Sequence, residues 1–195
     1  MTRRLLVVCT ANVCRSPVAA ALLARALNGR RDIDGHDWAV SSAGTGEYRA
    51  ELDSGTVKAA AAVGVDLSTH RSRVVDREVL AVDGADLVIT MARAHLPVVV
   101  GLDPAAWSRT FTLKDLARRA NELPPPSETE GFGGWLTRMC PGRQARDMLK
   151  PDPADDVDDP YGLPLRHHEA MIAEVAHEID NLVRWGPWAA RPDAD

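Results

Sequence analysis

Two cysteines and an arginine lie close together near the start of the chain, in the stretch VCTANVCRSP. Cys9 ends an apolar run, Arg15 comes six positions later, and Ser16 with Pro17 begins a predicted helix. The backbone N–H groups of such a turn and of the first helical turn have no internal partners, so together they can bind an anion. A cysteine held among these donors is favoured as the thiolate, which is a nucleophile.

The residues around Cys9 suit a displacement at phosphorus. Arg15 can offer two parallel N–H groups to phosphate oxygens, which a lysine cannot do. Ser16 can donate a hydrogen bond to the thiolate, and Asn12 tolerates a left-handed backbone conformation. The expected chemistry is transfer of a phosphoryl group to sulfur, through a cysteinyl-phosphate intermediate.

The spacing of cysteine and arginine is weak support by itself, because Cys140 and Arg146 repeat it. In that second copy Pro141 removes a backbone N–H, no buried strand comes before it, and Asp147 would repel an anion. We therefore place the site at Cys9 and expect Cys140 to be an ordinary thiol.

Short apolar runs alternate with helical patterns along the chain. Strands are predicted at residues 4–8, 37–42, 85–90 and 109–113, and helices at residues 17–27, 54–63 and 167–185. Ser16 is the predicted N-cap of the first helix. Alternating strands and helices favour a parallel sheet covered on both faces, whose ligands collect at the carboxyl ends of the strands. Cys9 falls at such an end.

Composition narrows the setting of this site. The chain has 195 residues, enough for one domain with a substantial core, and is 45% hydrophobic and 26% charged. A net charge of -5 leaves no basic footprint for nucleic acid or a membrane surface. The first apolar stretch is too short for a signal peptide, so we expect a cytoplasmic protein. The chain has three cysteines, and their spacing is not that of a disulfide framework, so we do not expect structural disulfides.

The region from about residue 121 to residue 156 breaks the alternation of strands and helices. Residues 122–134 are polar and rich in Pro and Gly, so they are predicted to form a loop. Residues 135–150 are expected to hold a short helix, and the acidic stretch after them to form solvated turns.

Read in full, VCTANVCRSP resembles the amino-terminal loop of the low-molecular-weight protein tyrosine phosphatase family, Val/Ile-Cys-x-Gly-Asn-x-Cys-Arg-Ser-Pro. Further matching segments follow in order: SSAGT at 41–45, GVDLSTHRSR at 64–73, ADLVITM at 85–91 and DDPYG at 158–162. The resemblance implies one α/β domain over residues 1–195, a three-layer fold with a four-stranded parallel sheet in the order 2-1-3-4. Residues 121–156 are then expected to be an insertion before the acid loop.

The resemblance also implies roles for individual residues. Cys9 is the expected nucleophile, Arg15 binds the phosphoryl group, and Asp159, directly before Pro160, is the general acid; Asp158 is the alternative acid. The other expected phosphate-binding residues are Thr10, Ala11, Asn12, Val13, Cys14 and Ser16. Ser42 and His70 are expected to support the loop, and Tyr48 and Tyr161 to form pocket walls.

No metal or cofactor is expected, and His167, His168 and His177 are predicted to be polar surface positions.

The sequence departs from the family pattern at two positions. Ala11 replaces the commoner loop glycine, which requires that residue to keep a negative φ. Gly162 stands where many tyrosine-directed members carry a second aromatic residue. The related bacterial phosphoarginine phosphatases carry threonine at the loop position of Val13. The apolar side chain of Val13 suits an aromatic phosphoester better than it suits phosphoarginine. Whether Cys14 forms a disulfide with an oxidised Cys9 is left open.

The predicted function is therefore hydrolysis of phosphotyrosine on protein substrates by a monomer or weak dimer. Two alternatives of other classes are a phosphate-binding regulatory homologue without turnover, and an arsenate reductase of the same fold. Arsenate reductases of this kind need two more cysteines shortly after the third strand, and residues 65–103 contain none.

Overall fold

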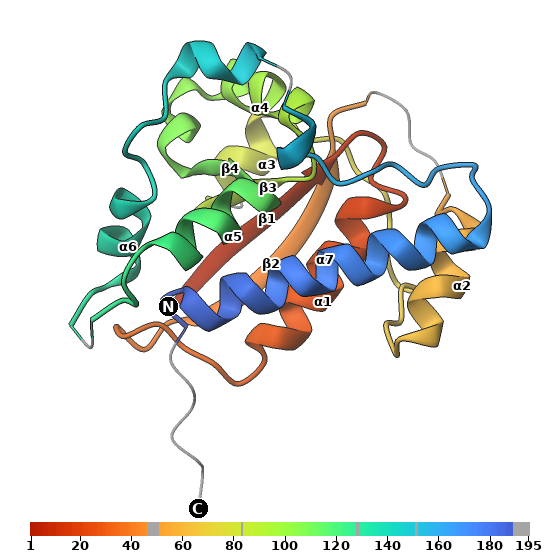
Figure 1. Ribbon diagram of the computed structural model, residues 1–195, viewed down its shortest axis with the longest axis horizontal. Helices are drawn as coiled ribbons and strands as arrows, with labels where there is room; N and C mark the ends of the chain where they lie inside the picture. The colour runs from red at the N-terminus through yellow and green to blue at the C-terminus, as the bar shows by residue number, and fades with distance from the viewer. Residues whose placement is uncertain (47–50, 83, 128, 151, 189–195) are drawn as a thin grey trace, which may run out of the picture.

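Four parallel strands form the central sheet in the order β2-β1-β3-β4, which confirms the predicted topology (Figure 1). The computed structural model describes residues 1–46, 51–82, 84–127, 129–150 and 152–188. The strands are β1 (Thr2–Cys9), β2 (Asp37–Gly44), β3 (Leu87–Thr90) and β4 (Thr110–Thr112). Because β1 lies between β2 and β3, Cys9 ends an interior strand, where both neighbours fix its position.

Residues of β1 alternate between two hydrophobic clusters, one on each face of the sheet. Leu5 and Val7 point into the larger cluster, whereas Leu6 and Val8 point into the smaller one. A strand with both faces buried reads as a continuous apolar run, as the sequence LLVV does.

Helices cover both faces, as predicted. Those that contribute to the larger cluster are α1 (Arg15–Leu27), α2 (Ser54–Ala62), α5 (Leu113–Glu122), α6 (Phe132–Arg138) and α7 (Leu165–Trp185). The smaller cluster includes residues of α3 (Arg77–Val82), α4 (Leu96–Leu102) and the 3₁₀ segment η2 (Pro104–Arg109). None of the helices in the described part of the chain is both long and apolar enough to cross a membrane.

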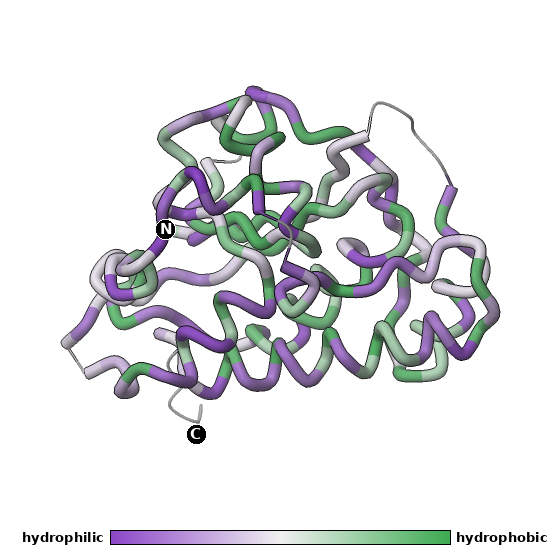
Figure 2. Tube along the Cα trace, turned by 45° about the horizontal axis from the view of Figure 1, so that its top comes forward, coloured by the Kyte–Doolittle hydropathy of each residue, from purple (hydrophilic) through white to green (hydrophobic). Residues whose placement is uncertain are grey.

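The terminal helix α7 packs across α1, α2 and α5 through one apolar stripe (Figure 1). Val175, Ile179 and Leu182 in this stripe are almost fully buried, and hydrophobic and hydrophilic positions alternate along the helix (Figure 2). The predicted terminal helix is confirmed, although it begins two residues earlier than expected, at Leu165.

The start of α1 differs from the prediction. The helix begins at Arg15 with Cys14 at the N-cap position, and Ser16 lies inside the first turn. Ser16 is therefore not the cap, and its hydroxyl group donates to the sulfur of Cys9. The predicted end of the helix at residue 27 is confirmed, since Asn28 is the C-cap and Gly29 has a φ of 75°.

Part of the region predicted as a loop is helical. Helix α6 begins at Phe132 because Phe132 and Trp135 are buried against Trp38 and Trp188, with ring centroids 4.6 to 6.4 Å apart. Helices α3, α4 and α5 were not predicted. For α5 a signal existed, since Leu113, Leu116, Ala117 and Ala120 lie at helical spacing.

His168 is not at the surface, and that prediction was wrong. Its side chain is 1% exposed, with Nδ1 2.9 Å from the hydroxyl oxygen of Thr56 and Nε2 3.1 Å from the carbonyl oxygen of Leu163. The helical period places position 168 on the buried face of α7, three residues before Met171. His167 and His177 are exposed, as predicted.

Gly44, at the end of β2, lies against the loop that follows β1. A Cβ atom at this position would lie 2.6 Å from the carbonyl oxygen of Thr10 and 3.0 Å from the backbone nitrogen of Asn12. Any larger residue at position 44 must therefore displace the loop.

We predict that Gly44→Ala lowers the free energy of unfolding by about 1–3 kcal/mol, because the loop backbone has to move. Gly101→Ala in α4 is the matched control, since its added Cβ would meet nothing within 4 Å. That control is expected to be stabilising by about 0.5–1 kcal/mol. Urea unfolding measures both, and equal effects of the two substitutions would contradict the prediction.

Candidate active site

The loop between β1 and α1 curls around the sulfur atom of Cys9. The Sγ atom accepts hydrogen bonds from the backbone N–H of Asn12 at 3.3 Å and from the hydroxyl of Ser16 at 3.0 Å. Cys9 is almost fully buried, with 2% of its surface exposed. Both donors favour a negative charge on the sulfur.

Asn12 gives the loop its shape. Its φ of 58° is the one positive value among the described non-glycine residues, so Ala11 keeps a negative φ, as its side chain requires. The Asn12 side chain donates to the hydroxyl oxygens of Ser16 and Ser42, each at 2.9 Å, and accepts from the backbone N–H of Arg73 at 3.1 Å. These bonds hold a backbone conformation that would otherwise be unfavourable.

His70 contacts the same residue from outside the loop. Its Nε2 atom lies 2.9 Å from the carbonyl oxygen of Asn12. Burial lowers the pKa of His70, and the charges of Arg71 and Arg73 lower it further. A neutral imidazole can donate to this carbonyl with one nitrogen. The structure therefore places Ser42 and His70 against Asn12, as expected of loop supports.

Arg15 links the loop to the segment that carries the expected acid. Its Nη2 atom donates to the Asp159 carboxylate at 2.5 Å and to the Thr10 hydroxyl at 3.1 Å, and its Nη1 atom donates to the carbonyl of Val157 at 3.3 Å. The Nε atom is buried and has no partner. A guanidinium with an unused buried donor beside Cys9 is suited to bind a further oxyanion.

His95 was missed by the sequence analysis. This buried residue, in the 3₁₀ segment η1 (Arg93–His95), has its Nε2 atom 3.0 Å from the hydroxyl oxygen of Thr10. Burial, followed by the charge of Arg15, lowers the pKa of His95 to about 4, so its ring is neutral near pH 7. The signal was its place just after β3, because parallel strands end at one edge of the sheet.

The cavity above Cys9 has a volume of about 320 Å³. Its lining residues are Cys9, Thr10, Ala11, Val13, Cys14, Arg15, Asp159 and Tyr161. Tyr161 is 63% exposed, so it stands at the rim. Tyr48, the other expected pocket wall, lies outside the described residues. A larger hollow of about 770 Å³ lies between α2 and residues 64–72, and Cys9 does not line it.

One group of side chains beside the site has the residue types of a metal centre. Ligand atoms of Cys14, Asp53 and His168 lie within 4.8 Å of one another. Burial raises the pKa of the Cys14 thiol to about 12, and both imidazole nitrogens of His168 already have oxygen partners. A protonated thiol and an engaged imidazole are poor ligands, so this group does not fit a metal ion.

Known proteins resemble this chain in sequence and in fold. The family model described as "Low molecular weight phosphotyrosine protein phosphatase" matches residues 4–131. A protein-arginine-phosphatase from Geobacillus stearothermophilus is 30% identical over 185 residues, covering 93% of this chain and 95% of its own. A probable low molecular weight protein-tyrosine-phosphatase EpsP from Ralstonia solanacearum is 33% identical over 146 residues, covering 74% and 94%.

A solved structure supports the same assignment. The low molecular weight protein tyrosine phosphatase from T. tengcongensis is 28% identical and superposes with a TM-score of 0.65, covering 94% of this chain and 99% of that chain. The family match spans more than half of the chain, and the arginine phosphatase covers nearly all of it. This chain therefore belongs to the low molecular weight phosphotyrosine protein phosphatase family, whose members are hydrolases.

Proposed function

We propose that the protein hydrolyses phosphotyrosine in proteins through a cysteinyl-phosphate intermediate. The observation that carries the proposal is that Cys9, Arg15 and Asp159 line one cavity, with donors directed at the sulfur atom. A nucleophile, an oxyanion-binding group and a proton donor are the three functions that the reaction needs.

In the first step the Cys9 thiolate attacks phosphorus, and the bond from phosphorus to the leaving oxygen breaks. The N–H groups of the loop and the guanidinium of Arg15 neutralise the charge on the transferring group. Asp159 gives its proton to the leaving phenolate oxygen. Asp159 rather than Asp158 suits this role, because only Asp159 lines the cavity.

In the second step a water molecule attacks the phosphocysteine. The Asp159 carboxylate accepts the proton from this water, and the sulfur of Cys9 leaves as a thiolate. The hydrogen bond from Ser16, at 3.0 Å, stabilises the departing sulfur. The enzyme thus returns to its starting charge state without a further proton donor.

The lining of the cavity favours an aromatic phosphoester. Ala11 and Val13 present small apolar side chains beside the cysteine, and Tyr161 is the one described aromatic residue of the lining. Gly162 has a φ of 71°, so an aromatic residue there would be strained and the second wall is absent.

Phosphoarginine is the second candidate substrate. A relative named protein-arginine-phosphatase aligns with 93% of this chain, which is the observation that favours it. Val13 offers no hydroxyl group to a guanidinium, so we rank phosphotyrosine first.

The remaining alternatives have less support. Besides Cys9 and Cys14 the chain has one cysteine, Cys140, whose thiol lies 3.3 Å from the carbonyl oxygen of Ser108, and arsenate reduction needs further thiols. Cytoplasmic residence, the insertion at 121–156 and a monomer or weak dimer stay predictions, and a disulfide between Cys9 and Cys14 stays an open alternative.

We predict that Cys9→Ser abolishes hydrolysis of para-nitrophenyl phosphate, and that Asp159→Asn lowers kcat/KM for phenyl phosphate by about 10²- to 10⁴-fold. Steady-state kinetics measure both. Cys140→Ser and Asp158→Asn are the matched controls, and each is expected to keep wild-type rates. Turnover that survives in Cys9→Ser would refute the covalent mechanism.

We further predict that a phosphotyrosine peptide is hydrolysed with a kcat/KM about tenfold or more above that of the same peptide carrying phosphoarginine. The physical reason is the apolar contact that Val13 offers to a phenyl ring. Phosphate release from the two peptides at one pH measures the ratio. A preference for phosphoarginine would show that the second candidate is the correct one.

A further inference from the structure

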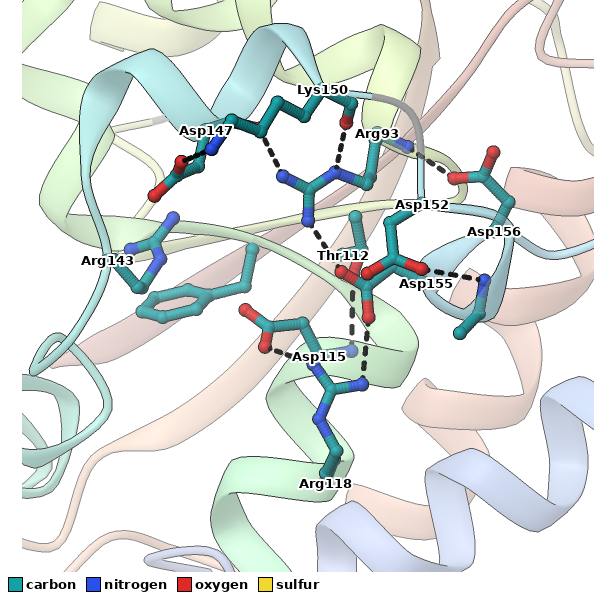
Figure 3. A network of polar contacts seen from close by, with 12 residues as sticks. Arg93, Thr112, Asp115, Arg118, Arg143, Asp147, Lys150, Asp152, Asp155 and Asp156 are labelled. Atoms are coloured by element: carbon teal, nitrogen blue, oxygen red, sulfur yellow. Dashed lines mark hydrogen bonds and ion pairs between the residues drawn. The ribbon is translucent and has the colours of Figure 1, made fainter.

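A group of charges around the buried carboxylate of Asp155 lies beside the acid loop and takes no part in the mechanism above. It comprises Arg93, Arg118, Asp155 and Asp156, and we name it the acid-loop anchor (Figure 3). We propose that the acid-loop anchor positions Asp159 for proton transfer, which makes Asp155 and Arg93 positioning residues. This inference rests on the proposed function, in which Asp159 is the general acid.

The centre of the acid-loop anchor is the carboxylate of Asp155. Its side chain is 2% exposed, so the predicted solvated turn was wrong at this residue. It accepts from Nη1 of Arg93 at 2.7 Å and from Nη1 of Arg118 at 2.8 Å. Burial opposes the charge of Arg118, but the hydrogen bond and the charge of Asp155 raise the pKa of Arg118 above its usual value. Both carboxylate oxygens of Asp155 are thus held by cations from different elements (Figure 3).

Arg93 connects this carboxylate to the end of the sheet. It follows β3 by three residues, and its backbone N–H donates to Asp156 at 2.7 Å. Its remaining guanidinium donors bind the carbonyl oxygens of Asp147 and Lys150, so all three of its side-chain nitrogens have protein partners (Figure 3). A side chain bound at three nitrogens keeps one conformation.

From the acid-loop anchor the chain reaches the catalytic groups within a few residues. The N–H of Val157 donates to the carbonyl of Met91 at 2.9 Å, and the N–H of Met91 donates to the carbonyl of Val8 at 2.8 Å. The carbonyl of Val157 accepts from Arg15. Fixing Asp155 therefore fixes the backbone that leads directly to Asp159, in register with the strand that ends at Cys9.

Stability alone is a weak reason for this arrangement. Burying an ion pair costs desolvation energy, and well-packed apolar residues of similar size often stabilise a fold equally or better. Directional bonds to one carboxylate, in contrast, fix where a loop lies. The segment after Asp159 needs such a reference, because Tyr161, Gly162 and Leu163 are all exposed.

The test is the dependence of kcat/KM on the leaving group. Phenyl phosphate needs a proton from Asp159 as its bond breaks, whereas 2,4-dinitrophenyl phosphate has a stable leaving group that needs almost none. A displaced acid therefore slows the first substrate selectively, and a general loss of structure slows both.

We expect Asp155→Asn to lower kcat/KM about tenfold for phenyl phosphate and less than about twofold for 2,4-dinitrophenyl phosphate. Arg118→Gln keeps the pair between Arg93 and Asp155. It is expected to lower kcat/KM selectively for phenyl phosphate as well, but by less than Asp155→Asn does. Asp103→Asn removes a 2.7 Å pair with Arg109 away from this loop and is expected to leave both rates unchanged.

Equal losses on both substrates, or no loss on either, for Asp155→Asn and Arg118→Gln would overturn the inference. Asp159→Asn, measured alongside, separates this failure from that of the proposed function. If Asp159→Asn is selective for phenyl phosphate and Asp155→Asn is not, only the positioning role is lost. If Asp159→Asn shows no selectivity, the acid assignment fails, and the inference fails with it.

Discussion

A ring of donors can close around the sulfur of Cys9 only because the loop reverses direction at Asn12. A left-handed conformation costs a residue other than glycine roughly 1–2 kcal/mol. The Asn12 side chain makes hydrogen bonds with Ser16, Ser42 and Arg73, and each such bond contributes about 0.5–1.5 kcal/mol net. The bonds outweigh the cost, so the conformation needed to bind an oxyanion is also stable without one.

The parallel sheet also fixes the position of the loop. Cys9 and Gly44 end neighbouring strands in register, and the absence of a side chain at Gly44 lets the loop lie against β2. The N–H groups of Thr45 and Gly46 donate to the carbonyls of Cys9 and Thr10 at 2.9 and 2.8 Å. The carbonyl groups on the outer side of the loop are thereby satisfied, while the N–H of Asn12 donates to the sulfur on its inner side.

The sequence predicts those parts of the site that depend on residues close together along the chain. The strand, the turn at Asn12 and the placing of Arg15 all follow from residues within one short stretch. His168 and His95 were misjudged or missed, because their burial depends on contacts with residues 112 and 85 positions away along the chain. Ser16 was expected both to cap the helix and to donate to the Cys9 thiolate, and the structure shows only the second contact, because the helix begins one residue before it, at Arg15.

The ion pairs of Asp155 and Asp159 differ in a way that suits their positions. Asp155 is 2% exposed and its partner Arg93 is 17% exposed, so dissolved salt screens this pair little, whereas the second partner, Arg118, is 45% exposed. The Asp159 side chain is 45% exposed, and water and salt weaken its attraction to Arg15. A phosphate dianion carries more charge than a carboxylate and can use the free Nε of Arg15, so it can displace Asp159 from the guanidinium. The loop therefore keeps its place through the pair of Asp155 with Arg93 while Asp159 exchanges partners, which a single shared pair could not do.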